Sequence, residues 1–322
     1  MRLSSVRRLT LSGLIAGLLA SPAFASDTIL ADGSSTVFPI TQEAAERSKL
    51  VVDNRFSGTT AGFRRFCAGE TDISNASRPI NREEMARCEA AGVRYVELPI
   101  AFDAIAIVVN GSNDWVRDIT TDELKTLWQP QAEGQEITWQ DLRAEWPDRP
   151  VSLFGRGSNS GTYDYFTAVI NGETRASRSD YLASENEEEL VEAMLAEPDA
   201  LGFFGVGAYF RHWQELHDVA VDSGKGPVYP ALNEVLGGQY QPLARPLFLY
   251  VNAGALEQKA TLRPFLEGYL DGVRHWLHVT GYMPLSVEAY GKAQQRLAEG
   301  QTGTRFGGEL AVGLGLDELY QD

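Results

Sequence analysis

The sequence has few of the residues that hold metal ions or form nucleophile–base pairs. Among 322 residues it contains two cysteines and four histidines. His275 and His278 lie close in sequence but lack a clear acidic third ligand, so a helix surface explains them better than a metal site. The chain also has no G-x-S-x-G elbow, no Walker Gly-Lys-Ser/Thr and no dinucleotide-binding glycine spacing. These absences argue against an enzyme and leave only a catalytic group assembled by the fold.

Positive charge is also scarce. The sequence has 28 lysines and arginines against 44 acidic residues, which gives a formal charge of −16 at pH 7. Such a protein binds nucleic acid and anionic lipid poorly, so we expect neither as a partner. Net charge cannot attract a small anion either, and local dipoles with a few placed side chains would have to do so. The acidic run 185–192 is interpreted as a solvated helix face.

Long apolar runs are scarce too: no stretch after the first 25 residues is apolar enough to cross a membrane. Residues 9–20 follow three arginines and precede Ala23-Phe24-Ala25, an A-x-A cleavage site. The run is short for a membrane span, and no cysteine follows it as a lipid attachment site. We therefore expect residues 1–25 to be a cleaved signal peptide and the mature protein to be periplasmic. Loss of the three arginines would change the formal charge to −19.

Cys67 and Cys88 are the only cysteines in the sequence. In an oxidising compartment the simplest interpretation is a disulfide that closes a short local loop. The alternative is a metal-binding or redox pair. A C-x-x-C spacing or nearby histidines would indicate such a pair, and the sequence shows neither.

Strand patterns alternate with helix patterns along the chain, which predicts an α/β fold. The mature length suits two domains. Two apolar strands, at 104–110 and 246–252, bracket a middle block that has its own strands and helices. This arrangement predicts two α/β lobes joined by a double hinge. The first lobe would comprise residues 26–108 and 249–322, and the second residues 109–248.

Three turns rich in Ser, Thr and Gly each follow a predicted strand and open a helix. They lie at 33–36, 57–62 and 155–162. The first turn of a helix has N–H groups without internal partners, and the helix dipole adds about half a positive charge there. Helix capping explains one such turn, but three of them at the carboxyl ends of strands predict an anion site. Arg156 adds a fork that can hold two oxygens of a tetrahedral oxyanion.

The sequence around these turns resembles the PstS phosphate-binding family, in order and over nearly all of the mature chain. The similar segments are GSSTVFP at 33–39, SGTTAGF at 57–63, CAGETDISNASRP at 67–79, GRGSNSGTYDYF at 155–166 and RPLFLYV at 245–251. The resemblance implies a type II periplasmic-binding-protein fold and a receptor with no catalytic activity and no cofactor. The receptor would be a monomer that holds one inorganic phosphate between its lobes by hydrogen bonds. It would deliver the ion to the membrane permease of an ABC importer.

The resemblance also implies a set of phosphate-binding residues on the three turns. The family's ligands match Ser35 and Thr36 in the first turn, Ser57 or Thr59 in the second, and Arg156, Ser160, Gly161 and Thr162 in the third. All of these residues offer a hydroxyl group, a backbone N–H group or a guanidinium group. The implied site therefore consists of hydrogen-bond donors.

The chain departs from the family pattern after the strand predicted at 73–77. Well-known members have an aspartate where this chain has Ser77, followed here by Arg78. That aspartate accepts the proton of hydrogen phosphate and repels sulfate. Ser77 is itself expected among the phosphate-binding residues, because its hydroxyl group can accept a hydrogen bond, although it does not impose the same charge penalty. Asp103 is the candidate for the missing carboxylate, and Arg78 is the candidate for a second cation. Because Ser77 puts this discrimination in doubt, a receptor for sulfate, phosphonate or an organic phosphate is an alternative, as is a secreted phosphoester hydrolase.

Overall fold

The first half of the molecule is built on a mixed sheet. The computed structural model describes residues 28–313, so the predicted signal peptide lies outside the described residues. The sheet has the order β2 (Val52–Asn54), β1 (Ile29–Gly33), β3 (Ile73–Ala76), β11 (Ala244–Asn252) and β4 (Tyr95–Asn110). β1 pairs in parallel with β2 and β3, whereas β11 is antiparallel to β3 and β4.

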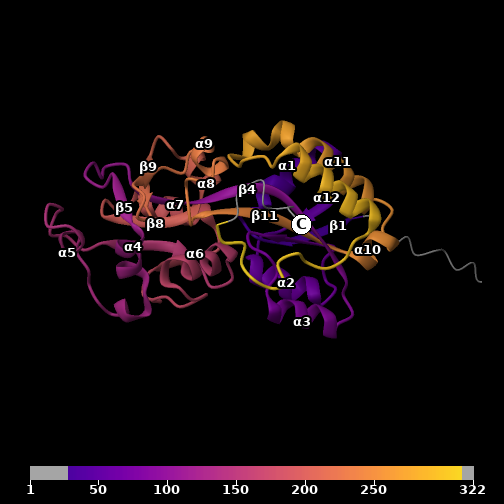
Figure 1. Cartoon of the computed structure of the whole chain (residues 1–322), viewed down its shortest axis with the longest axis horizontal. Coiled ribbons are helices and arrows are strands. Elements are labelled where there is room, and N and C mark those ends of the chain that lie inside the picture. The colour runs from indigo at the N-terminus through magenta and orange to yellow at the C-terminus, as the bar shows by residue number, and fades with distance from the viewer. Residues whose placement is uncertain (1–27, 314–322) are drawn as a thin grey trace, which may run out of the picture.

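The long strand β4 belongs to both halves of the molecule. All 16 of its residues are buried. Residues 95–104 pair with β11, and residues 105–109 pair with β8 (Ala200–Gly205). Figure 1 shows β4 running from one half into the other. A single continuous strand therefore links the two halves.

The second half is built on strands that extend from the far end of β4. β8 pairs in parallel with β6 (Ser152–Arg156), and β6 pairs in parallel with β7 (Leu182–Ser184). On its other side β4 pairs with β9 (Leu216–Asp222). β9 also pairs with β5 (Asp118–Thr120) and β10 (Pro227–Val228).

Helices surround the sheet strands of both halves (Figure 1). The first half carries α1 (Phe38–Ser48), α2 (Thr59–Cys67), α3 (Arg82–Ala90), α10 (Ala253–Gln258), α11 (Leu262–Trp276) and α12 (Val287–Glu299). The second half carries α4 (Thr121–Trp128), α5 (Trp139–Leu142), α6 (Gly161–Asn171), α7 (Glu187–Leu195), α8 (Val206–Arg211) and α9 (Leu232–Leu236). Two 3₁₀ helices span Pro130–Ala132 and Leu277–Thr280. The predicted α/β class is confirmed.

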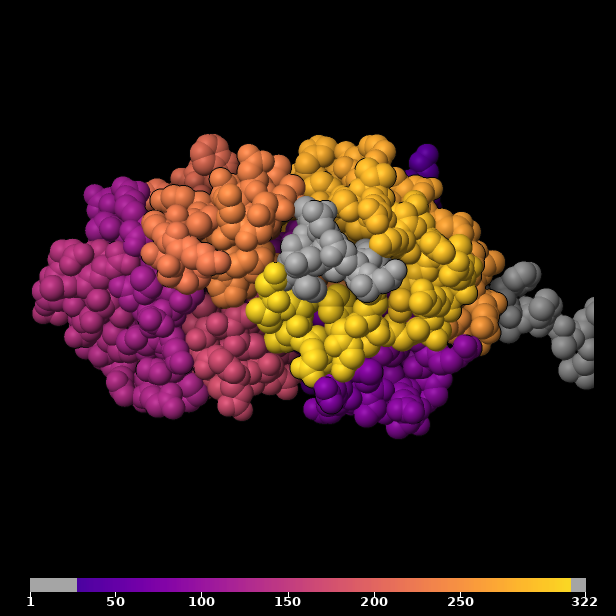
Figure 2. Space-filling model, in the orientation of Figure 1, coloured from indigo at the N-terminus to yellow at the C-terminus, as the bar shows by residue number. Residues whose placement is uncertain are grey.

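The middle of the chain forms the second half of the molecule. Figure 2 shows the magenta and orange middle of the chain gathered on one side, and the indigo and yellow ends on the other. The strand partner of β4 changes between residues 104 and 105, and β11 pairs with β4 from Ala244 onward. These positions lie a few residues before the predicted boundaries. We therefore take residues 28–104 and 244–313 as the first lobe, and residues 105–243 as the second.

A disulfide links two helices of the first lobe. Cys67 is the last residue of α2, and it is bonded to Cys88 in α3, 21 residues later. The predicted disulfide is therefore confirmed. In the part of the chain that the structure describes, no helix is both long and apolar enough to cross a membrane.

Candidate anion-binding site

The first and third predicted turns meet between the two lobes. The hydroxyl group of Thr36, just before α1, lies 3.4 Å from the hydroxyl group of Thr162 in the first turn of α6. The guanidinium group of Arg156, the last residue of β6, donates a hydrogen bond to the Ser35 hydroxyl group. Thr36, Arg156 and Thr162 are at most 1 % exposed. An anion held by these groups would therefore be shielded from water.

The second turn joins the same place through Gly161. The hydroxyl groups of Thr59, at the start of α2, and Ser77, just after β3, lie 3.1 Å apart. A Cβ atom at Gly161 would lie only 2.7 Å from each of these oxygens, so a glycine is required there. The structure thus brings together eight of the predicted residues: Ser35, Thr36, Thr59, Ser77, Arg156, Ser160, Gly161 and Thr162.

The N-terminus of α6 supplies a local positive potential. Ser160 caps this helix, because its hydroxyl oxygen accepts a hydrogen bond of 3.1 Å from the Thr162 N–H group. Nε of Arg156 approaches the same oxygen at 3.4 Å. The helix has 11 residues, so its dipole and its free first-turn N–H groups favour negative charge at this end. The Arg156 guanidinium group and the N-terminus of α6 therefore both contribute positive potential near the Ser160 hydroxyl group.

Arg245 is a second buried cation at the site, and the sequence analysis gave it no ligand role. Its Nη2 donates a hydrogen bond of 2.7 Å to the Thr162 hydroxyl group. Its Nε and Nη2 also donate to Oδ2 of Asp103, and both side chains are fully buried. Arg245 and Asp103 lie opposite each other on β11 and β4. Opposite charges on the two predicted hinge strands were the signal in the sequence that could have identified this pair.

Two guanidinium nitrogens have unused donor capacity. Nη1 of Arg156 and Nη1 of Arg245 make no hydrogen bond with any residue in the range 28–313, although Nη1 of Arg156 lies 3.4 Å from a carboxylate oxygen of Glu187. A buried donor without a partner costs free energy, and most such donors in proteins are satisfied. The unused N–H groups therefore indicate where the oxygens of a ligand would bind.

Asp103 is a buried carboxylate at the edge of this site. Burial disfavours its charged form and raises its pKa to about 6, although the Arg245 guanidinium group acts in the opposite direction. The negative charge of Glu187 also raises this pKa. Arg245 links Asp103 to Thr162, since its Nη2 donates to both, while Oδ1 of Asp103 makes no hydrogen bond with any described residue.

Arg78 does not face the anion donors, which corrects the expectation that it adds a second cation there. Nε of Arg78 donates to Asp164, and its Nη1 and Nη2 both donate to Glu84. The two remaining N–H groups donate to the Pro79 carbonyl and the Thr60 hydroxyl. All five donors of the guanidinium group are thus occupied by protein acceptors.

Ser57 also lies outside the cluster of donors. Its hydroxyl group donates a hydrogen bond of 2.9 Å to Asp32, and its N–H group donates to the other oxygen of the same carboxylate. Asp32 also pairs with Arg65. Of the two alternatives for the second turn, Thr59 and not Ser57 lies at the site.

Glu187 is buried, in contrast to the expectation from the sequence. It begins α7 inside the acidic run that was expected to be a solvated helix face, yet it is only 4 % exposed. Its Oε1 accepts a hydrogen bond of 3.1 Å from the Thr36 hydroxyl group and lies 3.4 Å from Nη1 of Arg156. The Gly205 N–H group donates to the same oxygen at 3.3 Å. The structure therefore places a second carboxylate against the donors.

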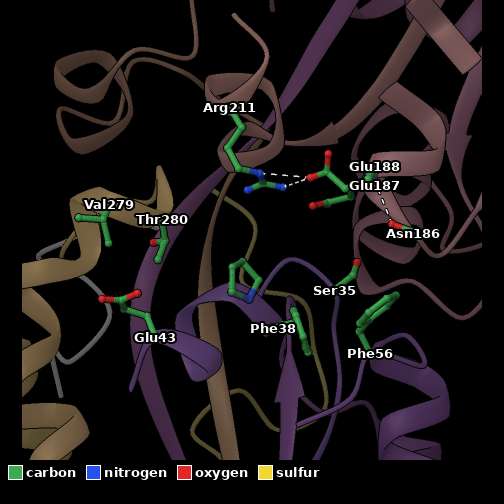
Figure 3. A pocket seen from close by; sticks show the side chains of 11 residues that line it. Ser35, Phe38, Glu43, Phe56, Asn186, Glu187, Glu188, Arg211, Val279 and Thr280 are labelled. Carbon is green, nitrogen blue, oxygen red and sulfur yellow. Dashed lines mark hydrogen bonds and ion pairs between the residues drawn. The ribbon is translucent and has the colours of Figure 1, made fainter. Parts of the chain in front are cut away.

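A cavity of about 490 Å³ opens beside the site. It is lined by Ser35, Phe38, Pro39, Glu43 and Phe56 of the first half, by Asn186, Glu187, Glu188 and Arg211 of the second, and by Val279 and Thr280. Figure 3 shows Ser35 and Phe56 facing Asn186 and Glu187 across this space. Arg211 is paired with Glu188 and so contributes little free positive charge. The cavity forms a half-apolar entrance to the buried donors.

Two lobes that close on a buried, donor-lined site define a solute-binding protein. In agreement, a family model described as PBP superfamily domain matches residues 20–271. Protein SphX of Synechocystis sp. is 44 % identical over 314 residues, which covers 96 % of this chain and 94 % of that protein. The phosphate-binding protein PstS of Staphylococcus haemolyticus is 32 % identical over 267 residues, or 80 % of this chain and 81 % of its own. The chain therefore belongs to the PstS-like phosphate-binding family.

Solved structures agree with this assignment. A possible phosphate binding protein from Planctomyces limnophilus is 37 % identical, with a TM-score of 0.63, over 85 % of this chain and 98 % of that one. An ABC-type phosphate transport receptor from Vibrio cholerae, 22 % identical, shares the fold with a TM-score of 0.58 over 79 % of this chain and 99 % of that one. The type II periplasmic-binding-protein fold is thus confirmed. The family consists of substrate-binding proteins and not of enzymes, as expected from the sequence.

Proposed function

We propose that this protein captures inorganic phosphate between its two lobes and delivers it to the permease of an ABC importer. The observation that carries the proposal is the convergence of three donor-rich turns on two buried guanidinium groups with unused N–H groups. The names of the relatives point to the same ligand. In this proposal the protein acts as a periplasmic monomer.

The proposed ligands come from both lobes. The donors are hydroxyl groups, guanidinium groups and the first N–H groups of α6, and they belong to Ser35, Thr36, Thr59, Ser77, Arg156, Ser160, Gly161, Thr162 and Arg245. Because the site is buried, a bound ion would exchange its hydration shell for these hydrogen bonds. Binding would then favour the closed arrangement of the two lobes, since each lobe supplies only part of the shell.

Isothermal titration calorimetry of the mature protein tests this function. We expect one inorganic phosphate bound per chain and a phosphate-dependent rise in melting temperature, because a ligand that binds only the folded state stabilises it. The absence of both heat and thermal shift would overturn the proposal. A turnover assay with phosphoesters separates the receptor from the hydrolase alternative, and competition with sulfate and phosphonate separates it from receptors for other oxyanions.

A further inference from the structure

The proposed anion site contains negative charge that simple anion binding does not explain. Arg156 and Arg245 supply two positive charges, and the carboxyl groups of Asp103 and Glu187 supply up to two negative charges. These four side chains are at most 4 % exposed. The partly exposed carboxyl group of Glu185, 4.0 Å from Nη2 of Arg156, can add a third negative charge. A buried carboxylate close to a bound anion repels it strongly, unless a proton lies between the two oxygens. The ligand of this site should therefore carry a proton of its own.

The carboxylate of Asp103 is compensated by a guanidinium group. Its Oδ2 accepts hydrogen bonds of 3.0 Å and 2.7 Å from Nε and Nη2 of Arg245. These charge-assisted hydrogen bonds compensate Oδ2, but the other oxygen, Oδ1, is buried and makes no hydrogen bond with any residue in the range 28–313. Asp103 is therefore a second candidate for the group that recognises a protonated ligand, but it contacts the donor residues only through Arg245 among the described residues, whereas Glu187 contacts Thr36 and Arg156 directly.

The carboxylate of Glu187 has a different environment. Its Oε1 contacts the Thr36 hydroxyl group at 3.1 Å and Nη1 of Arg156 at 3.4 Å, and both of these groups are proposed phosphate ligands. The Gly205 N–H group also donates to this oxygen, at 3.3 Å. A bound oxyanion would draw Thr36 and Arg156 toward its own oxygens. Glu187 would then lie within one hydrogen-bond length of the ion with its charge mostly uncompensated.

We propose that Glu187 accepts a hydrogen bond from the protonated oxygen of the bound ion and thereby selects protonated tetrahedral oxyanions. Phosphate and arsenate keep at least one proton at neutral pH, whereas sulfate keeps none. Sulfate would place an unprotonated oxygen against this carboxylate, and the two negative charges would repel each other. The inference rests on the proposed function, and it assigns the discrimination between phosphate and sulfate to α7 of the second lobe.

Replacing the Glu187 carboxylate with a neutral amide of the same shape tests the inference. Dissociation constants for phosphate, arsenate and sulfate are measured by calorimetry for the wild type, for Glu187→Gln, and for Glu192→Gln as a control that makes the same change on the exposed face of α7. We expect the wild type and the control to bind phosphate and arsenate and to exclude sulfate. In Glu187→Gln the ratio of sulfate to phosphate dissociation constants should fall by on the order of 100-fold or more.

The outcomes separate the two proposals. If the wild type binds neither phosphate nor arsenate, the proposed function fails. If the wild type binds phosphate and Glu187→Gln keeps the wild-type ratio, only the role of Glu187 fails, and Asp103→Asn then tests the other carboxylate. If the Glu187→Gln variant does not fold, a crystal structure of the wild type with bound phosphate tests whether Glu187 contacts the ion. A Glu187 oxygen about 2.5–2.7 Å from a phosphate oxygen supports the inference, and a separation beyond hydrogen-bonding distance overturns it.

Discussion

Arg156 and Arg245 are both buried arginines at the site, but their electrostatic environments differ. Arg245 is held by the Asp103 carboxylate through two N–H groups. Arg156 donates mainly to neutral oxygens, those of Ser35, Ser160 and the Glu185 carbonyl, and it approaches carboxylate oxygens no closer than 3.4 Å. Arg156 is therefore the cation whose charge a bound anion would neutralise.

The first prediction concerns Arg156. Arg156→Ala should weaken phosphate binding by about 2–5 kcal/mol, because it leaves a buried anion without its main charge-assisted partner. Arg156→Lys should also weaken binding, since an ammonium group cannot reproduce the planar fork. Calorimetry measures both effects. Arg178→Lys, which alters a guanidinium group paired with Asp180 inside the second lobe, is the control. Wild-type affinity in both Arg156 variants would place Arg156 outside the site.

The second prediction concerns the charge of Asp103. Its pKa is raised to about 6 by burial, above its ordinary value of 3.8. The unfolded chain therefore releases this proton first, so between about pH 4 and 6 the folded state should lose stability as the pH rises. The loss should be on the order of 3 kcal/mol at most and should level off above the folded-state pKa. In ligand-free unfolding experiments, the Asp103→Asn variant should not show this loss of stability between about pH 4 and 6. If the free energies of unfolding of the variant and the wild type changed in parallel with pH, the prediction would be wrong.

At the scale of single elements, local patterns predicted most of the fold. The three Ser/Thr/Gly turns precede α1, α2 and α6, as the pattern predicts. β4 was expected from 104 but begins at Tyr95. Glu97 and Asp103 interrupt the apolar run, and each is buried because a distant residue satisfies it: Tyr250 donates to Glu97, and Arg245 to Asp103. Such pairings depend on the tertiary structure and are invisible in a local pattern.

The burial of Glu187 was missed for the same reason. A run of acidic residues normally forms a solvated helix face, and most of α7 follows that rule. The first residue of the helix points instead toward Thr36 and Gly205, which are far away in the sequence. The sequence could thus predict the donors of the site, which lie in short motifs, but not the acceptors, which the fold brings from other elements.

The third prediction concerns the disulfide as a link between elements. The bond joins the C-terminal end of α2 to α3, whereas Thr59 lies at the opposite end of α2. Replacing both cysteines with serine should therefore lower the free energy of unfolding by about 3 kcal/mol and leave the phosphate affinity unchanged. Chemical denaturation and calorimetry measure the two quantities. A large loss of affinity would show instead that the disulfide positions the second turn.

At the scale of the whole molecule, a buried ion cluster spans the two lobes away from the anion donors. Asp164 on α6 accepts hydrogen bonds of 2.7 Å from Arg78 and 3.2 Å from the Thr60 hydroxyl group, both in the first lobe. Within its own lobe Asp164 accepts a hydrogen bond of 2.8 Å from Nε of Arg175. Arg78 and Asp164 are each 1 % exposed. The contacts between lobes form only when the lobes are closed, so this cluster should favour the closed state even without ligand.

The last prediction tests that coupling. Asp164→Asn keeps the shape of the side chain but removes the charge that Arg78 meets across the cleft, and Arg78 retains Glu84 as its partner. The variant should therefore fold, populate the open state more in small-angle scattering without ligand, and bind phosphate about tenfold more weakly, because binding must then supply the closure free energy. Asp180→Asn breaks an arginine–aspartate pair within the second lobe and should change neither quantity. If the two variants behave alike in scattering and affinity, the cluster stabilises the folded chain and does not set the closure of the lobes.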